Sequence, residues 1–145
     1  GIEGIGYGKG YVFAAEKFMQ VLRGFDALVG KGMNVIVIAH AQIKSYQDPD
    51  LDAAYDRFQM KLGKTFEPRL REWADCVLFA NYDTTLKQVG GNDKAPKFRG
   101  KDFGKRLIYT ERRAAFDAKN RFGLPERIPL DWDAFWASYQ DAISV

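Results

Sequence analysis

The feature that most constrains the fold is an apolar run, Met33–Gln42, that turns polar at its end. Its centre, Val35–Ala39, is rich in β-branched residues, which is typical of an interior strand of a parallel sheet that is covered on both faces. We therefore expect Asn34–Ala39 to form a central buried strand. His40 and Gln42 follow two residues apart, so they lie on one side of the strand if it continues.

This strand end is a candidate site, because ligands of open α/β sheets bind beyond the carboxyl ends of the strands. The alternative is that His40 and Gln42 are ordinary polar groups where a strand reaches the surface. Both interpretations stay open on these residues alone.

The flanking segments predict an α/β domain. Apolar residues recur at helical spacing from about Tyr11 to Val29, and a second helix is expected over Thr65–Ala74. Cys76–Tyr82 is typical of another buried strand, which we expect to run parallel to the central one. Residues 88–104 predict a loop or hairpin tip.

The last third of the chain predicts two short strands and a helix. The strands are expected at Leu107–Thr110 and Ala114–Ala118. Asp131 is placed to cap a helix that runs to about Ala142. We expect this helix to bury its aromatic residues, namely Trp132, Phe135, Trp136 and Tyr139.

Composition excludes several classes of protein. With 46% hydrophobic residues, 145 residues suffice for one packed domain. A single cysteine and a single histidine exclude an internal disulfide and argue against a metal site of the usual zinc kind. We find neither a membrane-length apolar run nor a signal-peptide pattern, so the cytoplasm is the expected location and no membrane partner is expected.

Basic charge is concentrated late in the chain. The net charge is +3, but residues 97–127 hold ten Lys or Arg against four Asp or Glu. An anionic partner is therefore expected.

Two other segments have the composition of a nucleic-acid contact. The glycine-rich opening carries Tyr7, Lys9 and Tyr11, although it lacks the Gly-x-x-x-x-Gly-Lys-Ser/Thr pattern of a phosphate-binding loop. A long polar connection, Ile43–Lys64, mixes basic and aromatic residues with four aspartates. Its candidate contacts are Lys44, Tyr46, Arg57 and Lys61.

Taken together, five blocks of sequence resemble the RecA-like ATPases, specifically a phage-encoded group linked to single-strand DNA recombination. The blocks are Gly6–Tyr11, Asn34–Lys44, Arg71–Tyr82, Thr110–Arg113, and Ala118–Pro125 followed by Pro129–Trp132. The resemblance implies a RecA-like P-loop NTPase core with a mostly parallel sheet, flanking helices, and a C-terminal hairpin and helix.

The family's phosphate-binding loop, catalytic glutamate and Walker B aspartate are not found in this sequence. The resemblance therefore implies that residues 1–145 are the C-terminal part of a single ATPase domain, with the Walker A and Walker B regions upstream. ATP and Mg²⁺ are expected for the full protein, and no cofactor is expected for this chain alone.

The resemblance also implies roles for individual residues. Gln42 would sense the γ-phosphate, and His40 would assist it. Residues 43–63 and Ile5–Tyr11 would be loops that bind single-stranded DNA. Lys119 and Arg121 would face the nucleotide of a neighbouring subunit in a homo-oligomer, a filament or a ring.

The full-length protein is expected to be an ATPase, and this chain alone is expected not to hydrolyse ATP. Lys119 and Arg121 could instead form a solvated basic strand edge. The whole chain could be a single-stranded DNA binding module, or a protein-interaction module built around Trp132 and Trp136, without ATP hydrolysis.

Overall fold

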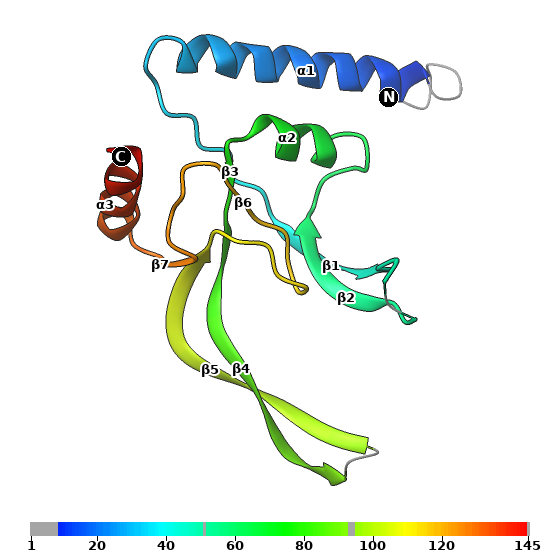
Figure 1. The fold of residues 1–145 in the computed structure, drawn as a ribbon. Helices are drawn as coiled ribbons and strands as arrows, with labels where there is room; N and C mark the ends of the chain where they lie inside the picture. The colour runs from blue at the N-terminus through cyan, green and yellow to red at the C-terminus, as the bar shows by residue number, and fades with distance from the viewer. Residues whose placement is uncertain (1–8, 51, 93–94, 145) are drawn as a thin grey trace. The chain divides into compact units, whose positions relative to one another are not determined.

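A computed structural model describes residues 9–50, 52–92 and 95–144; for residues 84–103 it describes the backbone and the strand pairing (Figure 1). The chain divides into two compact units, residues 1–74 and 75–145. In the first unit the elements are α1 (Lys9–Val29), β1 (Ala41–Tyr46), β2 (Tyr55–Met60) and α2 (Glu67–Trp73). In the second they are β3 (Cys76–Val77), β4 (Phe79–Asn92), β5 (Ala95–Tyr109), β6 (Lys119–Asn120), β7 (Arg127–Pro129) and α3 (Trp132–Ile143).

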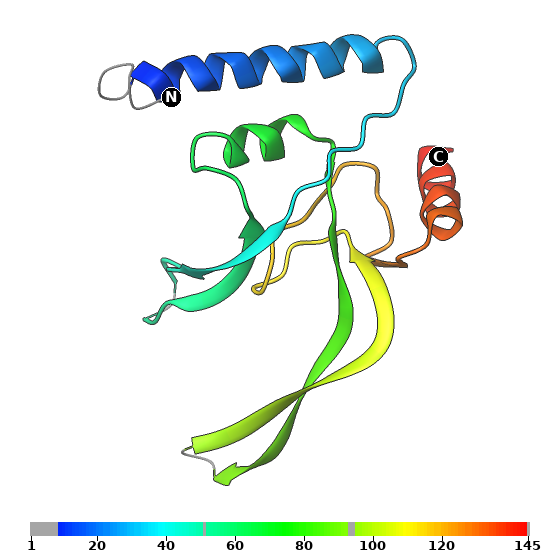
Figure 2. The ribbon, with the colours of Figure 1, turned by 180° about the vertical axis from the view of Figure 1, so that it is seen from behind.

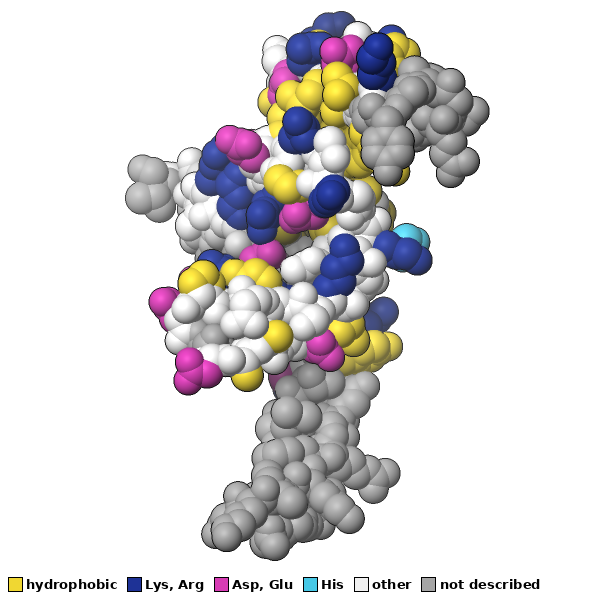
Figure 3. Space-filling model, turned by 90° about the vertical axis from the view of Figure 1, so that its right-hand side faces the viewer, with side chains coloured by type: hydrophobic (Ala, Val, Ile, Leu, Met, Phe, Trp, Pro, Cys, Tyr) yellow, Lys and Arg dark blue, Asp and Glu magenta, His cyan; other side chains and the backbone are white. Residues whose placement is uncertain are grey.

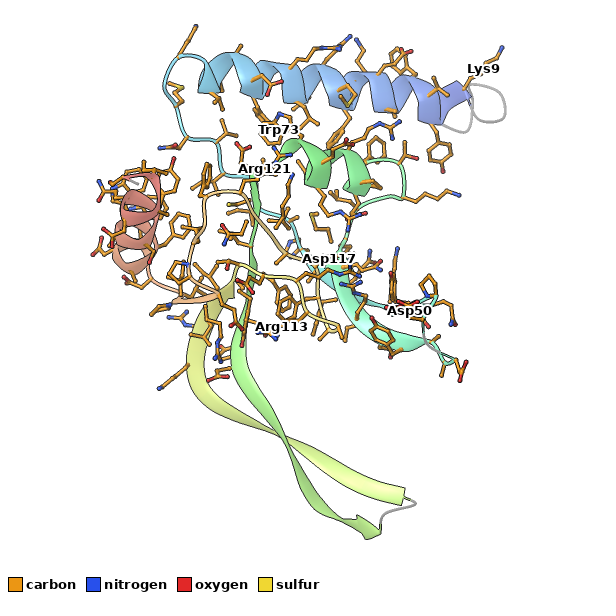
Figure 4. All side chains as sticks on the ribbon, in the orientation of Figure 1. Lys9, Asp50, Trp73, Arg113, Asp117 and Arg121 are labelled. Atoms are coloured by element: carbon orange, nitrogen blue, oxygen red, sulfur yellow. The ribbon has the colours of Figure 1, made fainter. Side chains whose placement is uncertain are left out.

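The two helices of the first unit lie alongside each other in both ribbon views (Figures 1 and 2). Phe18 of α1 meets Phe66 edge to face, with ring centroids 5.2 Å apart. Trp73 packs against Phe25 and donates its indole N–H to an Asp26 carboxylate oxygen at 2.7 Å (Figure 4). Aromatic residues on one face of each helix therefore join α1 to α2.

Strands β1 and β2 form an antiparallel hairpin in regular register, from Ala41 opposite Met60 to Tyr46 opposite Tyr55. The Tyr46 and Tyr55 rings contact each other edge to face at 5.7 Å. The guanidinium of Arg57 lies 4.7 Å from the centre of the Tyr46 ring, a cation–π contact. These side chains stabilise the hairpin near its tip.

The second unit contains two small sheets. Strand β5 pairs antiparallel with β4 on one side and with β7 on the other, and β3 pairs antiparallel with β6. Ile108, Leu124 and Ile128 form the buried core, and Phe135 and Tyr139 of α3 pack against it. Figures 1 and 2 show the β4–β5 hairpin continuing well past β7.

The turn after β6 is closed by the side chain of Asn120. Its amide nitrogen donates to the Leu124 carbonyl at 2.8 Å, and its amide oxygen accepts from the Leu124 N–H at 3.0 Å. Gly123 has φ 74°, which a residue with a side chain rarely adopts. These features bring Leu124 into the core and fix the end of β6.

The prediction for Asn34–Ala39 is wrong. The segment forms no strand, and most of it is exposed, including Ile38 at 93%. Strand structure begins only at Ala41, and every strand pairing among the described residues is antiparallel. An interior strand needs a partner on each side, and the described residues provide none here.

The predicted second strand, Cys76–Tyr82, forms as β3 and the start of β4, but its pairing is antiparallel and it is only half-buried. Ala114–Ala118 is not a strand; a turn occupies it, bracketed by a bridge between Arg113 and Phe116. Within residues 88–104, β4 and β5 extend through the described residues on both sides of the predicted tip, and residues 93–94 lie outside the described residues. The local composition correctly predicted extended or turn-rich backbone in these segments. It could not predict which segments pair with one another.

The helix predictions are confirmed with small shifts at their ends. Asp131 caps α3 by accepting a hydrogen bond from the Ala134 N–H at 3.0 Å. The burial expected for the aromatic residues of α3 is only partial: Phe135, Trp136 and Tyr139 are half-buried, and Trp132 is 57% exposed. Among the described residues, no helix is long and apolar enough to cross a membrane.

Replacing Asn120 by alanine is expected to destabilise the second unit by about 1–3 kcal/mol, because the Leu124 N–H and carbonyl both lose their partner. Chemical denaturation of the variant and of Gln140→Ala, which removes an exposed amide from α3, measures the difference. Equal stability of the two variants would contradict the role given to Asn120.

The stability of the fold is expected to fall above about pH 10 because of Tyr109. Burial raises the pKa of its phenol above the ordinary 10.0, the charge of Asp83 raises it further, and Arg127 partly opposes them. The folded state then holds the proton that the unfolded state releases, so stability is full below about pH 10 and is lost as the pH rises through the raised pKa. Denaturation of Tyr109→Phe against pH should show a smaller alkaline loss; an unchanged profile would assign that loss to another group.

Candidate functional site

The first candidate group lies where the exposed apolar segment enters β1. The backbone carbonyl of His40 accepts a hydrogen bond from the Lys61 N–H at 2.6 Å. The Gln42 side chain is half-buried and donates to the Met60 carbonyl at 3.1 Å. His40 itself is exposed, and its ring is the cyan side chain at the surface in Figure 3.

This arrangement links both residues to the end of β2. Gln42 lies within β1 and His40 just before it, so the two residues are not on one strand. One N–H of the Gln42 amide is engaged at Met60, and the same amide group has a second N–H donor and an acceptor oxygen with which it can contact a ligand. A ligand that contacts Gln42 would therefore act directly on the base of the β1–β2 hairpin.

The second candidate group surrounds the end of β6. Lys119 is half-buried within β6, opposite Val77, and Arg121 follows the strand. The guanidinium of Arg121 donates to an Asp75 carboxylate oxygen at 3.1 Å, and its backbone N–H donates to the Asp75 carbonyl at 3.3 Å. The Arg121 side chain remains 55% exposed, so only part of its hydrogen-bonding capacity is used (Figure 4).

Asp75 is the residue that the sequence interpretation missed. It immediately precedes β3, and antiparallel pairing of Cys76 with Asn120 brings it opposite Arg121. Opposite charges at neighbouring cross-strand positions attract and hold each other's side chains. The register that reveals this pair is not visible in the sequence.

The structure leaves some of the predicted DNA contacts exposed and buries another. Lys44 and Lys61 are exposed on or beside the β1–β2 hairpin, and Tyr46 is half-buried in its aromatic contact. Arg57 is only 2% exposed, so in this conformation it is not available to nucleic acid. The expected irregular loop over residues 43–63 is in large part this hairpin.

The described part of the first predicted DNA-binding loop, Ile5–Tyr11, is helical. Lys9 and Tyr11 lie in the opening turn of α1 instead of a loop, and Tyr7 lies outside the described residues. Both Lys9 and Tyr11 are exposed. Tyr11 lines an open cavity of about 450 Å³ between the two helices of its unit, together with Met19, Arg23 and Arg69.

Comparison with known families gives the class of this chain. The family model described as an AAA domain matches residues 1–122, and the chain belongs to that family. This places it among nucleotide-binding, ATPase-like proteins of the P-loop NTPase kind, which generally bind ATP with Mg²⁺. Searches of curated proteins and of solved structures gave no significant match.

Among the described residues, no group of three or more His, Cys, Asp or Glu is arranged to hold a metal ion. The two cations at the end of β6, Lys119 and Arg121, carry N–H donors that are suited to phosphate oxygens.

Removing the Arg121 side chain is expected to change the stability of the second unit by less than about 1 kcal/mol, because its ion pair with Asp75 is largely exposed to water. Denaturation of Arg121→Ala measures this, with Asn120→Ala as the destabilised reference. A loss as large as that of the Asn120 variant would mean that Arg121 serves mainly to hold the fold together.

Proposed function

We propose that this chain acts in a phage-type, RecA-like ATPase that couples ATP binding and hydrolysis to single-stranded DNA within a homo-oligomer. Membership of the AAA domain family supports the nucleotide chemistry. The observation that carries the proposal further is the exposed, partly engaged guanidinium of Arg121 beside Asp75.

In this proposal Arg121 and Lys119 contact the phosphates of a nucleotide held by the neighbouring subunit. A guanidinium offers several donors in a planar fork that matches phosphate oxygens. Asp75 holds that fork in one place, which lowers the entropy cost of engaging the phosphate. A cation supplied across a subunit boundary typically raises the rate by about 10³-fold or more.

Gln42 then serves as the phosphate sensor. Its amide is tied to Met60, and the neighbouring His40 carbonyl is tied to Lys61, so the sensor is joined to β2 by hydrogen bonds. The same hairpin carries Lys44 and Tyr46, the proposed DNA contacts. A phosphate bound or lost at Gln42 would shift the base of the hairpin and change the DNA affinity at its tip.

One observation favours a second function, a protein-interaction surface on α3. Trp132 is 57% exposed and stacks on Trp136 with ring centroids 5.8 Å apart. Exposed tryptophan is enriched at protein interfaces. This alternative predicts that Trp132→Ala weakens binding of a partner protein and leaves DNA binding and ATP hydrolysis unchanged.

The action of Arg121 across the interface is tested with the natural protein assembled as an oligomer. Arg121→Ala should lower kcat by about 10³-fold and leave nucleotide binding by isolated subunits nearly intact, because the cation acts mainly on charge in the transition state. Arg121→Lys should also lower kcat. Arg112→Ala is the matched control, because Arg112 is equally exposed and pairs with Asp117 in the same unit.

Mixing subunits gives the decisive result. Subunits carrying Arg121→Ala are combined with subunits whose own phosphate-binding loop is inactivated. Some hydrolysis should return, because at some interfaces an intact phosphate-binding loop of one subunit then faces an intact Arg121 of its neighbour. If mixed oligomers form and no activity returns, Arg121 does not act across the interface, and its role is confined to the ion pair with Asp75.

A further inference from the structure

The sheet face that carries the core of the second unit continues beyond the core. On this face Ile108 of β5 lies opposite Ile128 of β7, and both side chains are buried. Side chains two residues apart along a strand share a face, so the next row of this face lies about 7 Å further along. That row contains Arg106 of β5, which is exposed.

The strand register defines the rest of this row. Tyr82 of β4 is paired with Arg106. The N–H of Leu130, just after β7, donates to the Arg106 carbonyl at 2.9 Å, which extends the β5–β7 ladder by one pair. Tyr82 is 48% exposed and Leu130 is 39% exposed. The face that is buried at Ile108 and Ile128 is therefore open to solvent one row away.

The chain leads from this row directly into α3. Asp131 has extended backbone and caps the helix, and Trp132 follows, 57% exposed. Figures 1 and 2 show α3 beginning beyond β7, on the side away from β5 and β4. Asp133, in the first turn of the helix, is also exposed. We call five exposed residues the outer row: Tyr82, Arg106, Leu130, Trp132 and Asp133.

The outer row carries one cation and one carboxylate that are not engaged. Among the described residues, the side chains of Arg106 and Asp133 form no hydrogen bond or ion pair. The Asp131 carboxylate, in contrast, accepts from the Ala134 N–H. Arg106 precedes Leu130 in the row and Asp133 follows it, so the two opposite charges flank apolar side chains. The row therefore carries its own electrostatic complement.

We propose that the outer row is a contact between two copies of this chain, related by a twofold axis near Leu130. Rotation about this axis sets Arg106 of each copy against Asp133 of the other, with Leu130 and Trp132 packed between them. In such a contact each residue pair occurs twice, so one pair of opposite charges supplies two ion pairs. Trp, Tyr and Arg are also the residue types that most often carry the binding energy of an interface.

A second copy fits the row better than a partner of one charge sign. An acidic partner would satisfy Arg106 and face a like charge at Asp133, and like charges brought together at an interface are strongly unfavourable. Nucleic acid meets the same obstacle, because Asp131 and Asp133 flank the exposed ring of Trp132 and repel phosphates.

The contact between copies rests on the second function proposed above, the interaction surface on α3, and names its partner. It adds three residues of the sheet to that surface, Tyr82, Arg106 and Leu130. It requires neither nucleotide nor DNA, and Arg121 has no part in it. The proposed ATPase and DNA roles therefore do not depend on it.

The first test measures self-association of the natural protein without nucleotide or DNA, by sedimentation velocity over a range of concentrations. Arg106→Glu alone and Asp133→Lys alone should each raise the dissociation constant of the dimer at least about 10-fold, because each creates two like-charge contacts. Both changes in one chain should bring the constant back near its starting value, because the ion pairs then form in the reversed direction. Trp132→Ala should raise it by about 10-fold or more.

Mixing the two single variants gives a second test. A chain with Arg106→Glu repels its own copy, and so does a chain with Asp133→Lys. Together they complement each other, because one contact joins the two substituted residues and the other joins the two natural ones. A mixed dimer should therefore form at concentrations where neither variant dimerises alone.

The matched control makes the same kinds of charge change in the first unit, with Lys31→Glu and Asp52→Lys, both at exposed positions. Each control should leave self-association unchanged. Circular dichroism of every variant checks that it is folded. Arg106→Lys should keep most of the association, because the positive charge remains.

Three results would overturn the proposal. The natural protein could stay monomeric without nucleotide at every concentration. The single variants could lose association without recovery in the double variant, which would mean that Arg106 and Asp133 do not meet. Trp132→Ala could lose a different protein partner while self-association stays unchanged, which would keep the interaction surface and reject a second copy as its occupant. ATP hydrolysis is not part of the readout, so each of these results leaves the proposed ATPase role standing.

Discussion

The second unit depends on the hydrogen bonds between the Asn120 amide and the backbone of Leu124. They close the turn that buries Leu124 beside Ile108 and Ile128. They also hold Lys119 and Asn120 against β3, a ladder of only two residue pairs that could not define its own register securely. The same register sets Arg121 beside Asp75. One half-buried side-chain amide, that of Asn120, therefore fixes both the core and the position of Arg121.

The two candidate sites use polar groups in opposite ways. Gln42 is half-buried and donates to the backbone of Met60, so a change in the other hydrogen bonds of its amide is passed to the β1–β2 hairpin. Arg121 is largely exposed and held by a single carboxylate, so it can engage a second anion at little cost in stability. The first arrangement suits a sensor, and the second suits a cation that acts on a ligand held elsewhere.

The apolar segment before β1 shows how composition and burial can disagree. Asn34–Ala39 has the residues of an interior strand, and the structure leaves most of it exposed. Arg57 shows the converse, because a residue expected at a DNA surface is buried against Tyr46. In both cases the neighbours, not the residue itself, determine the exposure.

The sequence by itself determined the helices and the distribution of charge. Helical hydrogen bonds join residues four apart, so the apolar spacing of α1 and the Asp131 cap of α3 were sufficient to predict them. Only the tertiary structure decided the direction of the strands, the burial of Arg57 and the pairing of Asp75 with Arg121. Each of these depends on which distant segment lies alongside, because a strand makes its hydrogen bonds with a partner and not within itself.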